Sequence, residues 1–289
     1  MGSRGGVPTG QALRELEQLA VAVAEEAGAL VRDERPGRTV VDRAKSSDLD
    51  IVTVMDTRSE QLIRARLAAA RPDDGVLGEE EGLVTGRSGL TWVVDPIDGT
   101  VNYLYEIPAY CVSVAAVLGD PSVDGAWRPV AGAVVNPLTG ERYTAALGGG
   151  AWHRVGDGPA QRLTVADTSL DQALCGTGFG YDADRRAWQA AVLTHVLPRV
   201  RDIRRIGSAA LDLCRVADGS LDVHYERGLN PWDMAAGWLV ATEAGAVVTD
   251  LDGGHPRAGF TVAGPPAAQG SLRTLLRSAV EQVGPESAR

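Results

Sequence analysis

The chain has 289 residues, of which 44% are hydrophobic and 23% charged, a composition typical of a folded protein with a sizeable core. Its net charge of −10 argues against a broad binding surface for nucleic acid or an anionic membrane. Binding of an anionic substrate would require local positive charge, for example from bound cations. No apolar stretch approaches the ~18–20 residues of a membrane span. The three cysteines have no disulfide or zinc spacing, so we expect buried free thiols and a cytoplasmic location.

The first third of the chain alternates between helical periodicity and short apolar runs. We expect a flexible N-terminus over residues 1–10, because this segment is rich in glycine and has no apolar periodicity. The polar stretch 38–50 predicts a mobile surface loop. The apolar residues elsewhere predict helices over 11–34 and 57–69 and short strands over 51–54 and 76–77.

The rest of the chain predicts strands first and then alternating strands and helices. Segments 111–118, 130–135 and 141–146 are rich in valine and alanine and are typical of an antiparallel sheet. Gly148-Gly149-Gly150 lacks the Lys-Ser/Thr of a phosphate-binding P-loop and favours a plain hairpin. In the second half we expect strands over 174–178, 202–206, 221–225, 247–250 and 260–262, and helices over 185–197, 209–217, 233–245 and 270–283. Two intimately packed α/β lobes follow from this pattern.

The segment from Trp92 to Thr100 carries the first candidate site. Leu90 to Val94 predicts a buried strand, and Pro96 and Gly99 are expected to stop it, which delivers Asp95 and Asp98 onto a tight turn. Two carboxylates with the Ile97 carbonyl between them form a set of hard oxygens that suits magnesium, manganese or calcium. An ordinary turn capped by aspartates is the alternative interpretation.

Other acidic residues also stand at the ends of predicted elements. Asp56 follows one apolar run, Glu79 follows another, and Asp233 stands where a helix begins. Side chains at such positions share crevices in α/β folds. Each acid taken alone could equally be a solvated surface group or, for Asp233, a helix cap.

Several short segments follow one another along the chain in a recognisable order: Lys45-Ser46-Ser47 with Asp50, Val52-Thr53 and Asp56, Gly78-Glu79-Glu80, Asp95-Pro96-Ile97-Asp98-Gly99-Thr100, Arg204-Arg205-Ile206-Gly207-Ser208-Ala209-Ala210, Glu226-Arg227-Gly228 and Trp232-Asp233-Met234-Ala235-Ala236-Gly237. Together they resemble the inositol monophosphatase family, within the metal-dependent, lithium-inhibited sugar phosphatase superfamily. The resemblance spans residues 11–284. The paired arginines of this chain and its Pro231-Trp232-Asp233 are most similar to bacterial members of the family.

The resemblance implies an α/β (α+β) fold, specifically a five-layered α-β-α-β-α sandwich, and a homodimer. It implies a single catalytic domain over residues 11–284. One lobe, about 11–170, would carry most metal ligands, and the other, about 171–284, would carry Asp233 and the substrate contacts.

The resemblance also implies roles for individual residues. About two to three Mg²⁺ ions would be held by Glu79, Asp95, the Ile97 carbonyl, Asp98 and Asp233, with Asp95 bridging two of them. The residues implied in catalysis are Thr100 and Asp56, which would activate the attacking water, and Glu79. The phosphate would meet the amides of Gly99 and Thr100, and the inositol hydroxyls would meet Asp98, Ala209, Glu226 and Asp233.

The implied activity is Mg²⁺-dependent, lithium-sensitive hydrolysis of a small phosphate ester, with inositol 1-phosphate as the preferred substrate and in-line attack by water. Fructose-1,6-bisphosphatase, histidinol phosphatase and adenosine 3′,5′-bisphosphate phosphatase are alternatives within the superfamily. A regulatory binding protein without activity is the alternative from another class. A serine nucleophile is disfavoured, because Ser208 has no G-x-S-x-G context. The four histidines show no metal-ligand spacing and are expected to be structural or exposed.

Overall fold

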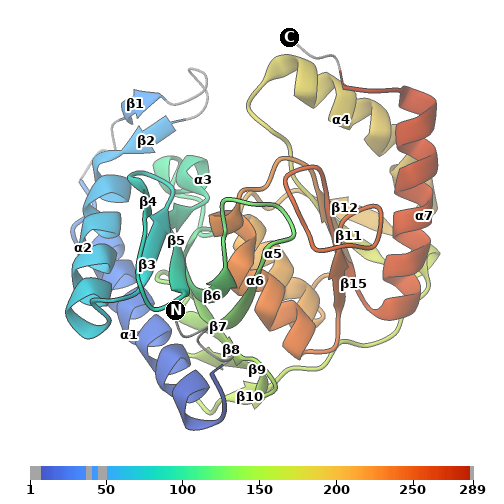
Figure 1. The fold of residues 1–289 in the computed structure, drawn as a ribbon. Coiled ribbons are helices and arrows are strands. Elements are labelled where there is room, and N and C mark those ends of the chain that lie inside the picture. The colour runs from blue at the N-terminus through green and yellow to red at the C-terminus, as the bar shows by residue number, and fades with distance from the viewer. Residues whose placement is uncertain (1–7, 37–40, 45–50, 287–289) are drawn as a thin grey trace.

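The computed structural model describes residues 8–36, 41–44 and 51–286. In this part of the chain, helices and two main sheets alternate in five layers (Figure 1), which confirms the predicted α-β-α-β-α architecture. The expected flexibility of residues 1–10 concerns mostly residues outside the described part. The same holds for the loop 38–50, with one correction. Its residues Val41–Ala44 form strand β1, which pairs with β2 (Ile51–Thr53).

The first layer consists of helices α1 (Gln11–Asp33) and α2 (Val54–Ala70). The predicted apolar stripe of α1 is buried, and it packs with α2 against one face of the larger sheet. Helix α2 begins three residues earlier than the periodicity predicts. The reason is a cap, because the Thr53 hydroxyl accepts a hydrogen bond from the Met55 amide and Asp56 accepts one from the Thr53 amide.

The second layer is the larger sheet, which has eight strands among the described residues. It is antiparallel except where β3 runs parallel to β5. In spatial order it contains β10 (Gln161–Arg162), β9 (Gly150–Val155), β8 (Glu141–Ala146), β7 (Trp127–Asn136), β6 (Cys111–Gly119), β5 (Leu90–Asp98), β3 (Gly75–Gly78) and β4 (Gly82–Val84). After β5 the chain forms the short helix α3 (Thr100–Leu104).

The third layer contains helices α5 (Ala209–Asp218) and α6 (Pro231–Glu243), which lie between the two sheets. Most residues of both helices are buried, as expected for helices covered by a sheet on each face. Their buried residues join Val93, Val134 and Val248 in one apolar cluster that reaches both sheets. The two lobes are therefore packed through a shared core.

The last two layers are the smaller sheet and the helices that cover its outer face, α4 (Ala183–Val196) and α7 (Pro266–Val283). Strands β11, β12 and β13 are mutually parallel where they pair, and the others pair antiparallel. In spatial order the described strands are β12 (Asp202–Arg204), β11 (Leu174–Thr177), β13 (Val223–Glu226), β15 (Thr261–Gly264) and β14 (Val247–Thr249), and two 3₁₀ turns cover Leu170–Gln172 and Leu197–Arg199.

Two further predictions concern the glycine triplet and the cysteines. The triplet forms the β8–β9 hairpin as predicted, and the amides of Gly148 and Gly150 donate to the Glu243 carboxylate at 2.8 and 2.9 Å. The anion that these amides bind is thus a side chain of α6. All three cysteines are buried free thiols. Among the described residues, none of the helices combines the length and apolarity needed to cross a bilayer.

Candidate active site

The centre of the candidate site is a β-bulge in β5. Asp95 pairs with Ser113 and Asp98 with Cys111 on β6, so two residues of β5 lie opposite one residue of β6. The prediction that Pro96 stops the strand is wrong, because the bulge accommodates a residue without an N–H and the ladder resumes at Asp98. The bulge turns both aspartates into the space between β5 and the start of α6.

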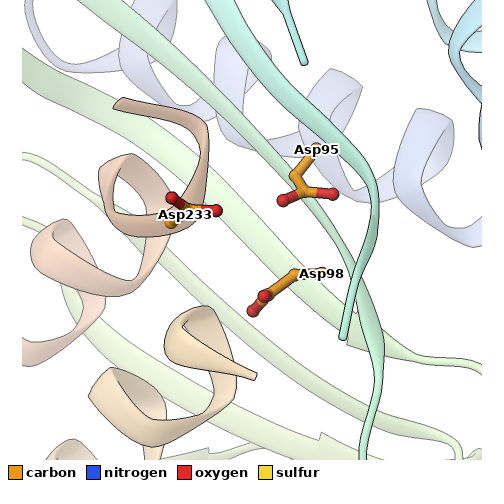
Figure 2. A group of neighbouring side chains, drawn as sticks. All are labelled: Asp95, Asp98 and Asp233. Carbon is orange, nitrogen blue, oxygen red and sulfur yellow. The ribbon is translucent and has the colours of Figure 1, made fainter. Parts of the chain in front are cut away.

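Three carboxylates meet in that space, as Figure 2 shows for Asp95, Asp98 and Asp233. One oxygen from each lies within 4.8 Å of the others. Asp233 also caps α6, since its Oδ2 accepts a hydrogen bond from the Asn230 amide at 2.6 Å. The expected helix start at Asp233 is therefore corrected: α6 begins at Pro231 with Asn230 as its N-cap, and Asp233, the third helical residue, reaches back to the Asn230 amide while also belonging to the cluster. Burial, reinforced by the negative charges of Glu79 and Asp98, raises the pKa of Asp233 well above its ordinary value.

Asp98 is held in place by the N-terminus of α5. Its Oδ2 accepts hydrogen bonds from the Ser208 hydroxyl at 2.6 Å and the Ala210 amide at 2.7 Å. Burial nevertheless raises the pKa of the Asp98 carboxyl, because desolvation outweighs these hydrogen bonds. Ser208 thus positions an acid instead of acting as a nucleophile.

Asp56 and Thr100 form a hydrogen-bonded pair behind the acidic cluster. The Thr100 hydroxyl lies 3.0 Å from Asp56 Oδ1 and also 3.0 Å from the Ile97 carbonyl oxygen. Thr53 donates to Asp56 Oδ2 from its amide at 2.8 Å and its hydroxyl at 2.5 Å. Burial raises the pKa of Asp56 to about 6, although these hydrogen bonds favour the charged form.

The turn that carries Glu79 is fixed by a buried acid on α2. Glu60 is fully buried, and its two carboxylate oxygens accept hydrogen bonds from the amides of Glu80 and Glu81 at 2.8 and 2.9 Å. Arg64 pairs with the same carboxylate at 2.8 Å. Gly78 is required beside it, because a Cβ there would lie 2.3 Å from Glu60 Oε1. Helix α2 therefore sets the position of the Glu79 backbone.

One cleft of about 470 Å³ contains nearly all of the predicted site residues. Its lining includes Glu79, Asp95, Ile97, Asp98, Gly99, Thr100, Ala209, Glu226 and Asp233, and Asp56 lies just behind it in contact with Thr100. Gly99 lines the turn at φ 97°, where a Cβ would lie 2.9 Å from the Ala109 carbonyl oxygen. Segments that are more than 100 residues apart in sequence thus come together in one cleft.

Comparison with known proteins identifies the family. The sequence model of the inositol monophosphatase family matches residues 12–284. The chain belongs to the inositol monophosphatase family. Membership makes it a phosphatase, that is, a phosphoric monoester hydrolase.

Individual members of the family are similar over most of their length. The inositol-1-monophosphatase of Mycobacterium leprae (strain TN) is 47% identical over 280 residues, covering 91% of this chain and 94% of the relative. The solved structure of Mycobacterium tuberculosis SuhB is 43% identical with a TM-score of 0.76, covering 96% of this chain and 100% of that one. The Nus factor SuhB of Pasteurella multocida (strain Pm70) is 36% identical over 240 residues, covering 82% and 85%.

The donor set of the cleft fits the metal dependence of an inositol monophosphatase. Carboxylates and a backbone carbonyl are oxygen ligands of the kind that Mg²⁺ prefers. The raised pKa of both Asp98 and Asp233 reflects burial of negative charge that a cation would offset. The cluster of Asp95, Asp98 and Asp233 is therefore suited to hold a divalent ion.

Sequence reasoning missed several residues of the site. Arg205, Asp212 and Arg185 line the cleft, and Glu60 and His224 lie behind it. A signal existed for Glu60, which stands four residues after Asp56 and so lies on the same side of α2. No local signal marks His224 as a neighbour of the cleft, because its position depends on how β11 and β13 pair.

Proposed function

We propose that the chain is a Mg²⁺-dependent inositol-1-monophosphatase that uses two to three ions in one active site. The observation that carries the proposal is the convergence of Asp95, Asp98 and Asp233 in the same cleft as Glu226. The relatives named inositol-1-monophosphatase support the same substrate.

The proposed metal ligands are Glu79, Asp95, the Ile97 carbonyl, Asp98 and Asp233. When bound, the ions would supply positive charge that offsets the phosphate and lowers the barrier to attack by water. The same Ile97 carbonyl is one of two acceptors near the Thr100 hydroxyl. Because the Asp56 carboxylate is the stronger acceptor, the Thr100 hydroxyl donates its hydrogen bond to Asp56. The lone pairs of the Ile97 carbonyl oxygen then stay available for a metal ion.

The Asp56–Thr100 pair is the proposed water-activating group. Because the Thr100 hydroxyl donates its hydrogen bond to Asp56, its oxygen can accept a hydrogen bond from the attacking water and so orient that water. The pKa of Asp56, about 6, is close to the operating pH and so suits proton transfer near neutrality. The amides of Gly99 and Thr100, at the start of α3, would hold the phosphate.

The alcohol of the substrate would be held on the other side of the cleft. Ala209 begins α5 and Glu226 ends β13, and both line the cleft together with Asp98 and Asp233. These groups can meet the hydroxyls of inositol. We assign residues 11–284 to a single catalytic domain of two lobes, 11–170 and 171–284, and, from the family resemblance, propose lithium sensitivity, a homodimer and a cytoplasmic location.

A regulatory binding role is the second candidate, supported by the relative named Nus factor SuhB. One assay tests the phosphatase proposal and the binding role together. It measures phosphate release from inositol 1-phosphate, fructose 1,6-bisphosphate, adenosine 3′,5′-bisphosphate and histidinol phosphate, with Mg²⁺ and with or without lithium. Fastest release from inositol 1-phosphate, inhibited by lithium, is the expected result. Faster release from another ester would change the substrate, and no release from any of them would favour the binding role.

A further inference from the structure

A row of three polar side chains lies beside the cleft in the smaller lobe. Asp212 of α5 stands at one end, His224 of β13 lies in the middle, and Glu226 stands at the other end. Asp212 and Glu226 belong to the cleft lining, whereas His224 is not part of it. His224 Nδ1 lies 3.9 Å from Asp212 Oδ2, and its Nε2 lies 3.6 Å from Glu226 Oε2. The His224 side chain is fully buried, whereas 15% of the Glu226 side chain is exposed.

The neighbouring strand is shaped to accommodate this row. Gly176 of β11 pairs with His224, and a Cβ at Gly176 would lie 2.9 Å from His224 Nδ1. Gly178, just after β11, stands beside Glu226 in the same way, because a Cβ there would lie only 1.9 Å from Glu226 Oε1. Glycines two residues apart thus make room for polar side chains two residues apart, on the same face of the sheet.

Hydrogen-bonding needs tie the three residues together. Neither ring nitrogen of His224 has a hydrogen-bond partner among the described residues, and Asp212 Oδ1 has none either. A buried polar group without a partner is unfavourable. The carboxyl groups of Asp212 and Glu226 face the two nitrogens at distances a few tenths of an ångström beyond a hydrogen bond. Small side-chain adjustments would therefore satisfy all three groups.

The pKa values of the three residues indicate which groups donate and which accept hydrogen bonds. Burial lowers the pKa of His224 to about 3, so the ring is neutral and has one donor and one acceptor nitrogen. Burial raises the pKa of Asp212 well above its ordinary value and that of Glu226 to about 8; Asp98 adds to both effects and Arg205 opposes them. The raised pKa of Asp212 favours its protonated form, which could donate to Nδ1 after a small adjustment; the N–H of the neutral ring would then lie on Nε2, facing Glu226.

We propose that Asp212 and His224 are a positioning pair that orients the Glu226 carboxyl toward the hydroxyl groups of the substrate. The proposal rests on the function proposed above, in which Glu226 contacts the alcohol. Asp212 is 1% exposed and His224 is 0% exposed, so we expect the pair to act through Glu226 and not through contacts of its own with the substrate. It therefore determines selectivity for the alcohol more than the reaction at phosphorus.

The test compares two substrates in His224→Phe and in Asp212→Leu, which keeps the approximate side-chain shape and removes the hydrogen-bond donor. Inositol 1-phosphate carries hydroxyl groups for Glu226, and p-nitrophenyl phosphate carries none. We expect KM for inositol 1-phosphate to rise roughly tenfold, the effect of losing one hydrogen bond, with a clearly smaller change for p-nitrophenyl phosphate. His224→Gln, which keeps an N–H donor, should recover part of the loss. An equal loss on both substrates would overturn the proposal.

A matched control and a double variant sharpen the test. His153 lies 3.8 Å from Glu141, far along the larger sheet and outside the cleft lining, so His153→Phe should leave both substrates unaffected. Because the pair acts through Glu226, adding His224→Phe to Glu226→Gln should cause no further loss of selectivity. Losses that multiply in the double variant would show that His224 acts independently of Glu226.

A measurement without substrate separates this proposal from the proposed function. In spectra of protein with ¹⁵N-labelled histidine, the His224 signal, identified by its absence in His224→Gln, should show a neutral ring with its proton on Nε2. Asp212→Leu, which removes the donor to Nδ1, should shift that signal. A His224 ring that ionises near the ordinary pKa of 6.5, or a His224 signal that is unchanged in Asp212→Leu, would overturn the pair. Absence of inositol 1-phosphate hydrolysis by the unaltered protein would instead overturn the proposed function.

Discussion

Replacing Asp56 by asparagine should stabilise the protein and inactivate it. The carboxyl group is 1% exposed and accepts hydrogen bonds from Thr53 and Thr100. Asparagine has nearly the same shape and can still accept from Thr53 through its oxygen. Its amide N–H₂ can donate to the Thr100 hydroxyl, but the variant has no charge to desolvate and no basic oxygen to receive a proton.

The size and sign of the effect follow from the pKa of Asp56. Folding raises this pKa from the ordinary 3.8 to about 6, so the folded state holds the proton more tightly. Stability from this group is fully present below pH 3.8 and is lost as the pH rises through about 6. The difference corresponds to about 3 kcal/mol in unfolding free energy. Each kcal/mol moves the Tm of a domain of this size by roughly 2–4 °C, so the variant should melt several degrees higher at pH 8.

Calorimetry in a chelating buffer from pH 4 to pH 8 measures this effect directly. The Tm advantage of Asp56→Asn should narrow toward pH 4, and Asp167→Asn, at an exposed position, serves as the matched control for an Asp-to-Asn replacement. Turnover of the Asp56 variant should fall by about 10²–10⁴-fold, the usual contribution of a general base. A Tm difference independent of pH would refute the desolvation argument, and near-normal turnover would refute the role in water activation.

The other predictions concern the metal ligands and their support. Asp95→Asn should lower turnover by orders of magnitude while circular dichroism shows an intact fold, and near-normal turnover at saturating Mg²⁺ would contradict the proposed bridging role. Mg²⁺ should raise the Tm of the unaltered protein relative to chelator, because the ions bind only the folded cluster; an unchanged Tm would count against a preformed site. Glu60→Gln should raise the Mg²⁺ concentration for half of that thermal shift about tenfold, through the Glu79 turn, whereas an unchanged midpoint would show that Glu60 does not support the site.

The sequence predicted the boundaries of helices and strands well where apolar periodicity determines them, and less well where a helix cap or a β-bulge determines them. Helix α1 matches its apolar stripe to within a residue. Helix α2 begins earlier than its stripe, because Thr53 and Asp56 cap it. Strand β5 continues beyond Pro96, because a bulge removes the need for an N–H at that position. These departures depend on hydrogen bonds that apolar periodicity does not encode.

The candidate site shows the same division. The short segments marked its acids as candidates because they stand at element ends, and the family resemblance then implied their roles. The contacts that hold those acids in place were not predicted, since Ser208 reaches Asp98 across 110 positions and Glu60 reaches the Glu79 turn across 20. Such supporting contacts are made by ordinary residue types, and only the tertiary structure shows which ones are close enough to act.

The proposed need for a metal ion and the proposed proton transfer have one physical origin, the burial of acidic groups at the cleft. Desolvation raises the pKa of Asp56, Asp98, Asp233 and Glu226 alike, and so each of these carboxyls opposes folding when it is ionised. For Asp98 and Asp233, which are proposed metal ligands, a cation can relieve that opposition, whereas Asp56 and Glu226 are not proposed ligands. The same burial therefore affects two proposed kinds of acid in the cleft: those that would bind a metal ion, and those that would exchange or donate a proton. A variant that neutralises either kind should gain stability without metal and lose function, which is why stability in chelator and activity should change in opposite directions.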